Sequence, residues 1–309
     1  MQKDIILSVS VPATSANVGV GFDCLGLAFN LRALFQFREA DTLEIAGCPL
    51  RFQNDDNLVW QAYTQACDKL GSDPTPKHIS IDSPIPFSGG LGSSSACVIA
   101  GVACALSESH GGWDPERALD LACRIEGHPD NVAPAIYGGL TSSFVEGGHT
   151  VCSRIKIARG FSFVAIAPPY SVQTEDARHI MPTEIPLETA VWQMGRVVAV
   201  TTALETGNAG LLATACVDKL HEPYRKKLIP DYEALREAAL MARASTFVIS
   251  GSGAAMIAVC DSPVVAQAVV ENAQKVRNDL WIRILNPSLA GTSITCDDGT
   301  IHHNTFDEI

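Results

Sequence analysis

The fold of this chain is decided by a segment rich in glycine and serine, Pro86-Phe87-Ser88-Gly89-Gly90-Leu91-Gly92-Ser93-Ser94-Ser95-Ala96. Glycines let the backbone approach a ligand closely. The small and apolar residues that follow predict a helix over residues 93–106, whose free N–H groups and positive dipole end attract an anion. A serine at the start of this helix can cap it and also reach a phosphate oxygen or Mg²⁺. The segment therefore predicts a phosphate-binding loop, with an ordinary glycine-rich turn as the alternative.

Three familiar nucleotide-binding patterns are absent from the sequence. There is no Gly-Lys dipeptide, which excludes the GxxxxGK[ST] loop of P-loop NTPases. The HRD and DFG motifs of protein kinases are missing as well. The glycines also lack GxGxxG spacing in a βαβ context, so a dinucleotide-binding domain is excluded.

Length and composition indicate two globular domains. A chain of 309 residues fits two units of about 150 residues each. Hydrophobic residues make up 47% of the chain and charged residues 18%, which is enough apolar material for buried sheets and helices. A change in composition before the apolar stretch at 161–167 places the boundary between residues 158 and 159. We expect an ATP-binding domain at 1–158 and a second domain at 159–309.

Charge and cysteine usage exclude several classes of partner. The net charge is −12, from 22 basic and 34 acidic residues, so neither nucleic acid nor an anionic membrane is expected to bind. The ten cysteines are scattered and contain no CxxC pair, which favours reduced thiols. Within the longest uncharged stretch, residues 83–107, only 96–106 are continuously apolar or small, too few to span a bilayer. We expect a cytoplasmic protein.

Hydrophobic periodicity predicts an α+β protein without regular βαβ alternation. The first strand is predicted over residues 5–11, ended by Pro12 and followed by a loop through Asn17. The other strands are predicted at 34–38, 43–45, 79–81, 161–167, 247–250, 255–259 and 281–285. Besides 93–106, helices are predicted at 57–70, 115–124, 188–205, 210–217, 231–244 and 264–277.

Residues 86–96 resemble the ATP-binding signature of the GHMP small-molecule kinases, PxGxGLGSSAA, with Ser88 where Gly is commonest and Ser95 in place of the first Ala. Further segments resemble family members that phosphorylate homoserine, in the same order along the chain: residues 12–23, 126–135, 221–225 and 249–253. The resemblance implies the GHMP kinase fold. In that fold an N-terminal domain like ribosomal protein S5 domain 2 and a C-terminal ferredoxin-like domain hold the nucleotide between them.

The resemblance also implies an activity. We expect transfer of phosphate from ATP, with Mg²⁺, to L-homoserine, which gives O-phospho-L-homoserine in threonine biosynthesis. The alternatives are a GHMP kinase with another hydroxy acceptor, such as threonine or an isoprenoid alcohol, and a non-catalytic ATP-binding sensor. We expect a homodimer without nucleic-acid or membrane partners.

The acceptor site implied by the resemblance contains Asn17, Asp23, His128, Asn131, Arg178, Arg225 and Gly251. A carboxylate such as Asp23 can bind the ammonium group of an amino acid, and two arginines can bind its carboxylate. The implied metal ligands are Ser94 and one carboxylate, for which Glu126 is favoured over Asp120. Ser94, Glu126 and Asn131 are the expected catalytic residues. Because an asparagine cannot usefully accept a proton at neutral pH, we expect catalysis to rest on positioning and charge neutralisation.

Overall fold

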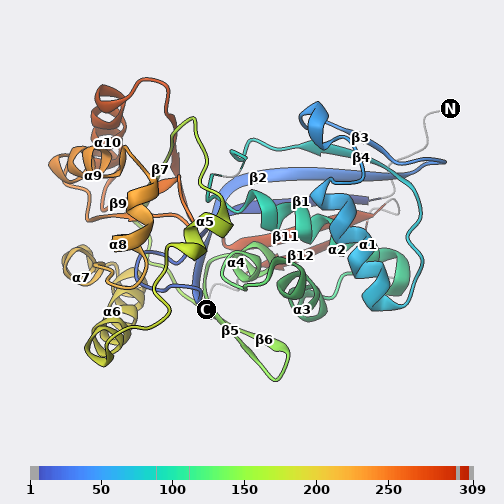
Figure 1. Ribbon diagram of the computed structural model, residues 1–309, viewed down its shortest axis with the longest axis horizontal. Coiled ribbons are helices and arrows are strands. Elements are labelled where there is room, and N and C mark those ends of the chain that lie inside the picture. Colours follow the sequence, from blue (N-terminus) through green and yellow to red (C-terminus); the bar gives the residue numbers. More distant parts are fainter. Residues whose placement is uncertain (1–6, 88, 111, 297–299, 306–309) are drawn as a thin grey trace.

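The computed structural model describes residues 7–87, 89–110, 112–296 and 300–305. Its strands form two sheets, and helices pack against each of them (Figure 1). The predicted α+β class is therefore confirmed. No helix in these described ranges is long and apolar enough to cross a membrane.

The first sheet has the strand order β12-β11-β1-β2-β4-β3, and β5 pairs with both β2 and β6. Its strands are β1 (Leu7–Ala16), β2 (Leu25–Glu39), β3 (Glu44–Ala46), β4 (Lys77–Asp82), β5 (Leu140–Glu146), β6 (His149–Ile155), β11 (Ala290–Cys296) and β12 (Ile301–Thr305). All pairs are antiparallel except β3 with β4.

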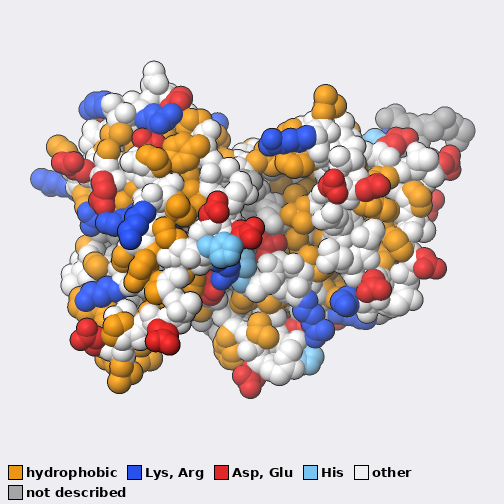
Figure 2. Space-filling view, in the orientation of Figure 1, with side chains coloured by type: hydrophobic (Ala, Val, Ile, Leu, Met, Phe, Trp, Pro, Cys, Tyr) orange, Lys and Arg blue, Asp and Glu red, His pale blue; other side chains and the backbone are white. Residues whose placement is uncertain are grey.

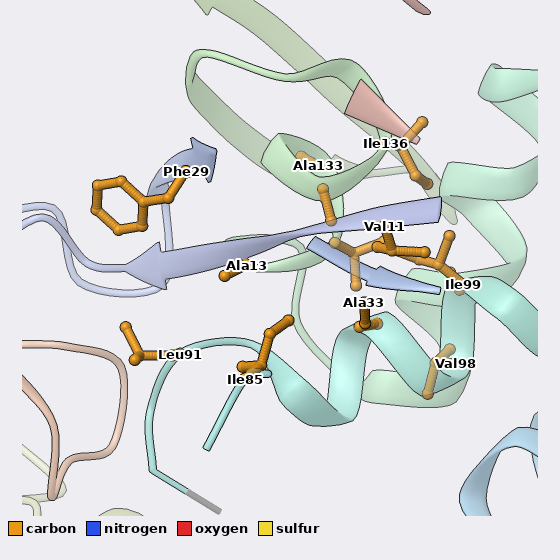
Figure 3. Packing of buried hydrophobic residues seen from close by; sticks show 14 of the residues in the cluster. Val11, Ala13, Phe29, Ala33, Ile85, Leu91, Val98, Ile99, Ala133 and Ile136 are labelled. Atoms are coloured by element: carbon orange, nitrogen blue, oxygen red, sulfur yellow. The ribbon is translucent and has the colours of Figure 1, made fainter. Parts of the chain in front are cut away.

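Four helices accompany this sheet: α1 (Leu58–Leu70), α2 (Ser93–His110), α3 (Pro115–Glu126) and α4 (Val132–Tyr137). A 3-10 turn, η1 (Leu50–Phe52), precedes α1. The side chain of Asn57 caps the start of α1, and Gly71 ends it in the left-handed conformation. Figure 3 shows Val11 and Ala33 of the sheet packing beside Ile99 of α2 and Ala133 of α4. Burial of this apolar layer fixes α2, and with it the glycine-rich loop, over the sheet.

The second sheet has the order β10-β7-β9-β8 and is antiparallel throughout. Its elements are β7 (Ser162–Ala167), β8 (Thr246–Ile249), β9 (Met256–Cys260) and β10 (Trp281–Leu285), with α9 (Tyr232–Met241) and α10 (Pro263–Val276) packed against it. Between β7 and α9 lie α5 (Thr174–His179), α6 (Leu187–Thr206), α7 (Ala209–Ala215), α8 (Glu222–Arg225) and the 3-10 turn η2 (Lys226–Leu228). The chain order and strand order together are those of a ferredoxin-like βαββαβ unit.

The predicted helices and strands are all present, and most ends differ by a few residues, but the strand predicted at 34–38 is only the second part of β2, which begins at Leu25. The prediction that Pro12 ends the first strand was wrong, because β1 runs on to Ala16. The pairing of β1 with β2 shifts between Pro12 and Thr14, and such a bulge accommodates a residue without an N–H group. The elements missed from the sequence are β5, β6, α4, α5, α8, β11, β12 and the two 3-10 turns.

The end of the chain returns to the first sheet. β11 pairs with β1 and with β12, so residues 290–296 and 301–305 belong to the same sheet as residues before 158. The core is also shared, since Phe29 of β2 packs on Phe163 of β7 with ring centroids 5.5 Å apart. The division into 1–158 and 159–309 stays a prediction, and it does not separate the two sheets.

Candidate active site

A cavity of about 510 Å³ lies between the two halves of the molecule and is lined by residues of both. Figure 2 shows this hollow, with acidic and histidine side chains gathered near the middle of the visible face. The glycine-rich loop and the start of α2 form one part of its wall. Charged side chains from distant segments form another part, which we call the ionic end of the cavity.

The glycine-rich loop is held by hydrogen bonds to protein groups. The carbonyl of Gly89 accepts from Ala255 N (2.8 Å), that of Gly90 from Ser250 Oγ (2.5 Å), and that of Leu91 from Thr14 N (3.2 Å). Gly90 has φ 79°, and a Cβ there would lie 2.3 Å from the Ser250 carbonyl oxygen. Only glycine fits this approach. The loop is therefore shaped by both halves of the molecule.

Within the part of the chain that the structure describes, the amides in the first turn of α2 have no backbone acceptor. The first intrahelical bond of this region runs from Ala96 N to the Gly92 carbonyl at 2.9 Å. The amides of Ser93, Ser94 and Ser95 precede it and therefore lack intrahelical acceptors. These three serines line the cavity. Free amides and the dipole of an 18-residue helix are groups that can bind an anion.

The serine hydroxyls meet one carboxylate at the end of α3. Ser94 Oγ donates to Glu126 Oε2 (3.1 Å), and Ser95 Oγ donates to Glu126 Oε1 (2.9 Å). Asp120, the other candidate metal ligand, instead accepts from Thr150 N (2.7 Å) and contacts His149 Nδ1 (2.8 Å). Of the two carboxylates, Glu126 lines the cavity.

A loop between β1 and β2 brings Asp23 to an arginine of α5. Arg178 donates from both terminal nitrogens to the two Asp23 carboxylate oxygens, at 3.1 and 3.2 Å. The Asp23 amide donates to Asn17 Oδ1 at 3.0 Å, which fixes the loop beneath this pair. The side chains of Arg178 and Asp23 are 41% and 36% exposed. Because exposed pairs add little stability, this one can open at low cost.

The second arginine is buried. Arg225 donates from Nη1 to the Gly251 carbonyl (2.9 Å) and from Nε to the Ala177 carbonyl (3.2 Å). Asn17 Nδ2 donates to the same Gly251 carbonyl at 3.0 Å. Burial lowers the pKa of Arg225, and Asp23 opposes that effect. The bonds to Gly251 tie the Asn17 loop to the turn after β8.

His128 and Asn131 complete the ionic end. His128 Nδ1 lies 2.7 Å from Asp130 Oδ1. Burial lowers the pKa of His128, but the hydrogen bond and charge of Asp130 outweigh burial and raise it above its usual value of 6.5. Asn131 Oδ1 accepts from Thr14 Oγ1 at 2.8 Å. With its oxygen engaged in this way, Asn131 has amide hydrogens to offer to a ligand.

Comparison with known proteins identifies the family. A family model described as the GHMP kinases N terminal domain matches residues 57–139, and one described as the GHMP kinases C terminal matches residues 201–279. Together they cover more than half of the chain. The chain belongs to the GHMP kinase family. The fold class expected from the resemblance is thereby confirmed, and as a kinase the protein uses ATP.

Individual members of the family are also similar to this GHMP kinase. Homoserine kinase from Clostridium beijerinckii is 36% identical over 302 residues, 97% of this chain and 100% of that protein. Homoserine kinase from Clostridium botulinum strain 657 is 40% identical over 249 residues, 80% of this chain and 84% of that one.

Solved structures agree with these sequence matches. The crystal structure of homoserine kinase from Cytophaga hutchinsonii has a TM-score of 0.82 at 28% identity and covers 95% of this chain and 98% of that one. Mevalonate kinase from L. major, solved in complex with R-mevalonate, has a TM-score of 0.66 at 17% identity, with coverage of 93% and 96%. The mevalonate kinase match shows the fold alone.

The structure brings most of the predicted site residues of this GHMP kinase together. All the predicted acceptor residues line the cavity: Asn17, Asp23, His128, Asn131, Arg178, Arg225 and Gly251. Within the loop, cavity-lining positions are Phe87, Gly90, Gly92, Ser93, Ser94 and Ser95. Pro86, Gly89, Leu91 and Ala96 are not among the lining residues, and Leu91 and Ala96 are buried in the core. Ser88 lies outside the described residues.

Sequence reasoning missed two groups of residues in this GHMP kinase. Asp130 lies between the predicted His128 and Asn131 and lines the cavity too, so its place in the same run of polar residues could have indicated it. Phe52 and Asn57 line an apolar part of the cavity, where Phe52 packs near Phe87 with ring centroids 6.4 Å apart. No sequence pattern links these residues, because they come from separate segments. Among the described residues, no group of three or more His, Cys, Asp or Glu side chains could hold a metal ion.

Proposed function

We propose that this GHMP kinase transfers the γ-phosphoryl group of ATP to the hydroxyl group of L-homoserine, forming O-phospho-L-homoserine for threonine synthesis. The relatives that are 36–40% identical carry the name homoserine kinase. The observation that carries the proposal is the Asp23–Arg178 ion pair in the cavity wall, at 3.1 Å.

A zwitterionic acceptor fits this pair. The ammonium group of homoserine would take the place of Arg178 on Asp23, and the carboxylate of homoserine would bind the freed guanidinium. Two charge-assisted hydrogen-bonded contacts then replace the one within the protein. Arg225 and His128, both in the same cavity wall, add positive charge beside the carboxylate. An isoprenoid alcohol such as mevalonate has no ammonium group and would leave Asp23 unpaired, which argues against that acceptor.

ATP would occupy the remaining part of the cavity. Its phosphates would lie against the amides of Ser93, Ser94 and Ser95, and its base against the apolar part near Phe52 and Phe87. The homoserine hydroxyl oxygen would form a bond to the γ-phosphorus while the bond to the β,γ-bridging oxygen breaks and ADP leaves. The hydroxyl proton would pass to the transferred phosphoryl group. Asn131 would donate a hydrogen bond that orients the hydroxyl, in a reaction that depends on alignment more than on a base.

Mg²⁺ fits the oxygen groups beside the phosphate loop. Ser94 Oγ and Glu126 Oε2 are hard oxygen ligands 3.1 Å apart, and Mg²⁺ takes one or two protein ligands together with phosphates and water. When bound, the ion would neutralise charge on the phosphate oxygens. Ser94 and Glu126 are therefore the proposed metal ligands.

We further propose a homodimer in which α6 packs against α6 of a second copy. Leu187, Val191, Met194 and Val198 follow one another at helical spacing and are 57–79% exposed. A solvent-facing helix surface is normally polar. An antiparallel pairing centred between Val191 and Met194 would bury these four side chains against those of the partner subunit.

We place the enzyme in the cytoplasm. All ten cysteines are free thiols. Reduced cysteines are typical of a reducing compartment.

An acceptor assay tests the proposed activity. ATP consumption is measured with homoserine, threonine, serine and mevalonate, with and without Mg²⁺. We expect turnover with homoserine that requires Mg²⁺, and its absence would overturn the proposal. Arg178→Ala is expected to raise the homoserine KM by about tenfold or more while the ATP KM stays unchanged. Arg178→Lys keeps the charge but loses the two-pronged contact, so it should give an intermediate KM.

A further inference from the structure

The loop that carries Asn17 and Asp23 has a strained backbone. Asn17, Val18 and Asp23 have φ angles of 70°, 44° and 55°, in the left-handed region. This region is costly for residues other than glycine, and most of all for a β-branched residue such as Val18. Such a conformation persists only where surrounding groups hold it. The groups that hold it therefore decide where Asp23 lies.

Side chains from the other half of the molecule hold this loop by its carbonyl oxygens. His221 Nε2 lies 2.6 Å from the Gly19 carbonyl oxygen. Gln193 Nε2 donates to the Val20 carbonyl at 2.7 Å. His221 is fully buried and Gln193 is 6% exposed, so water does not compete for these bonds. Two consecutive peptide groups of the loop are thereby fixed.

His221 also contacts the residue next to Asp23. Its ring stacks on Phe22 with centroids 5.4 Å apart and an angle of 23° between the planes. The guanidinium carbon of Arg225 lies 4.9 Å from the centroid of the same Phe22 ring. Phe22 therefore joins the His221 contact to the arginine that lines the acceptor site.

Asp218 holds both donors in place. Its Oδ2 accepts from the backbone amide of His221 at 2.7 Å, and Gln193 Nε2 also donates to its Oδ1. Burial lowers the pKa of His221, which favours the neutral ring. Because the Gly19 carbonyl can only accept, the single ring proton lies on Nε2. Nδ1 is buried without a hydrogen-bond partner among the described residues, which agrees with this tautomer.

We propose that His221 and Gln193 are positioning residues that set the acceptor selectivity of this kinase, by holding the loop so that Asp23 meets the ammonium group. The inference rests on the proposed function, because it presumes an acceptor that carries an ammonium group. His221 and Gln193 act through the loop and not by touching the acceptor.

Two replacements of His221 separate its contacts. His221→Phe keeps an aromatic ring to stack on Phe22 but removes the donor to Gly19. His221→Gln keeps an amide donor and removes the ring. We expect His221→Phe to raise the homoserine KM about tenfold, the factor expected for one lost buried hydrogen bond, with the ATP KM unchanged. His221→Gln should recover most of this loss.

The selectivity readout uses 4-hydroxybutanoate, which is homoserine without its ammonium group. In His221→Phe we expect kcat/KM to fall for homoserine and to stay the same for 4-hydroxybutanoate, so the preference for homoserine falls about tenfold. A general loss of stability would lower both values together. Gln193→Met, which removes the donor to Val20, should act in the same direction and serves as the test if His221→Phe does not fold.

Tyr63→Phe is the matched control. It removes a partly buried side-chain hydrogen bond to Glu108 (2.6 Å) in the other half of the molecule, and Tyr63 does not line the cavity. An unchanged preference in this control is expected, whereas a fall equal to that of His221→Phe would overturn the inference. If wild type phosphorylates homoserine and both His221→Phe and Gln193→Met keep its preference, the inference alone fails. If the wild-type enzyme does not phosphorylate homoserine, the proposed function is wrong, and the inference that rests on it falls with it.

Discussion

The protonation of His128 depends on its neighbour Asp130. Burial favours the neutral ring, yet the contact at 2.7 Å to the Asp130 carboxylate favours the imidazolium and raises the pKa of His128 above 6.5. The protonated ring is therefore kept to higher pH than in an ordinary histidine. Beside Arg178 and Arg225 it adds positive charge where the acceptor carboxylate is proposed to bind.

This gives an expected pH dependence for acceptor capture. The value of kcat/KM for homoserine should fall as pH rises through the raised pKa of His128, because the ring loses its charge. In Asp130→Asn the pKa is lowered, so the fall should begin at lower pH. Rate profiles of both enzymes at saturating ATP provide the measurement. Coincident profiles would show that Asp130 does not control the charge of His128.

The two carboxylates of α3 considered as metal ligands, Glu126 and Asp120, are expected to differ sharply in importance. Glu126→Gln keeps the shape of the side chain but removes the charge beside Ser94 and Ser95, so kcat should fall by about a hundredfold, a typical loss for a group that stabilises transition-state charge. A higher Mg²⁺ concentration should be needed for half-maximal activity. Asp120→Asn serves as the control, because Asp120 contacts Thr150 and His149 and should leave kcat unchanged. The reverse pattern would make Asp120 the metal ligand.

At the level of elements, α2 and the loop before it act as one unit. The loop approaches β1 so closely that a Cβ on Gly92 would lie 2.1 Å from Thr14 Oγ1, and Gly92 has φ 73°. Thr14 in turn donates to Asn131 Oδ1, at the start of α4. Thr14 therefore joins the loop proposed to bind phosphate to Asn131 of the proposed acceptor site.

Gly92→Ala is expected to damage both sites. The methyl group strains the loop and displaces Thr14, so the ATP KM should rise about tenfold and kcat should fall as Asn131 loses its partner. Steady-state kinetics with each substrate varied in turn measures both effects. Gly112→Ala is the control, because a Cβ there meets nothing within 4 Å. A change in ATP KM without any change in kcat would argue that Thr14 does not couple the two sites.

Elements could be predicted from the sequence where their signals are local. The helix at residues 57–70 was predicted because its apolar spacing lies within one segment, and the structure adds that Asn57 caps it. β11 was missed, since it is stabilised by pairing with β1, nearly the whole chain away. Short α4 was missed because tertiary packing of residues such as Ala133 on the sheet stabilises it more than its own length does.

At the scale of the whole molecule, a monomer does not explain why α6 exposes a stripe of apolar side chains, formed by Leu187, Val191, Met194 and Val198. Between Glu188 and Glu205 the helix carries one charged residue, Arg196. Figure 1 shows α6 at the outer side of the half that contains the second sheet. Burial of this stripe against another copy would remove apolar surface from water.

Val191→Glu combined with Met194→Glu is expected to give monomers, because four acidic groups would meet at the centre of the proposed interface. Light scattering coupled to size exclusion measures the molar mass. Met241→Glu is the control, since Met241 is 75% exposed on α9, away from this stripe. A wild-type monomer, or a dimer that survives the double substitution, would contradict the proposed interface.

The sequence by itself was enough to predict the loop that is proposed to bind phosphate. Glycine flexibility, the free amides of a helix start and serine hydroxyls are local properties, and here they lie in eleven consecutive residues, 86–96. Resemblance to a family then indicated the acceptor residues, which come from segments far apart in the chain.

Only the tertiary structure decided which of these groups meet. It placed Glu126, and not Asp120, against Ser94, and it joined Asp23 to Arg178 across 155 residues. It also placed His221 against the Gly19 carbonyl, 202 residues away. Contacts of this kind depend on the path of the whole chain and on the packing that fixes it, and no local pattern of residues encodes them.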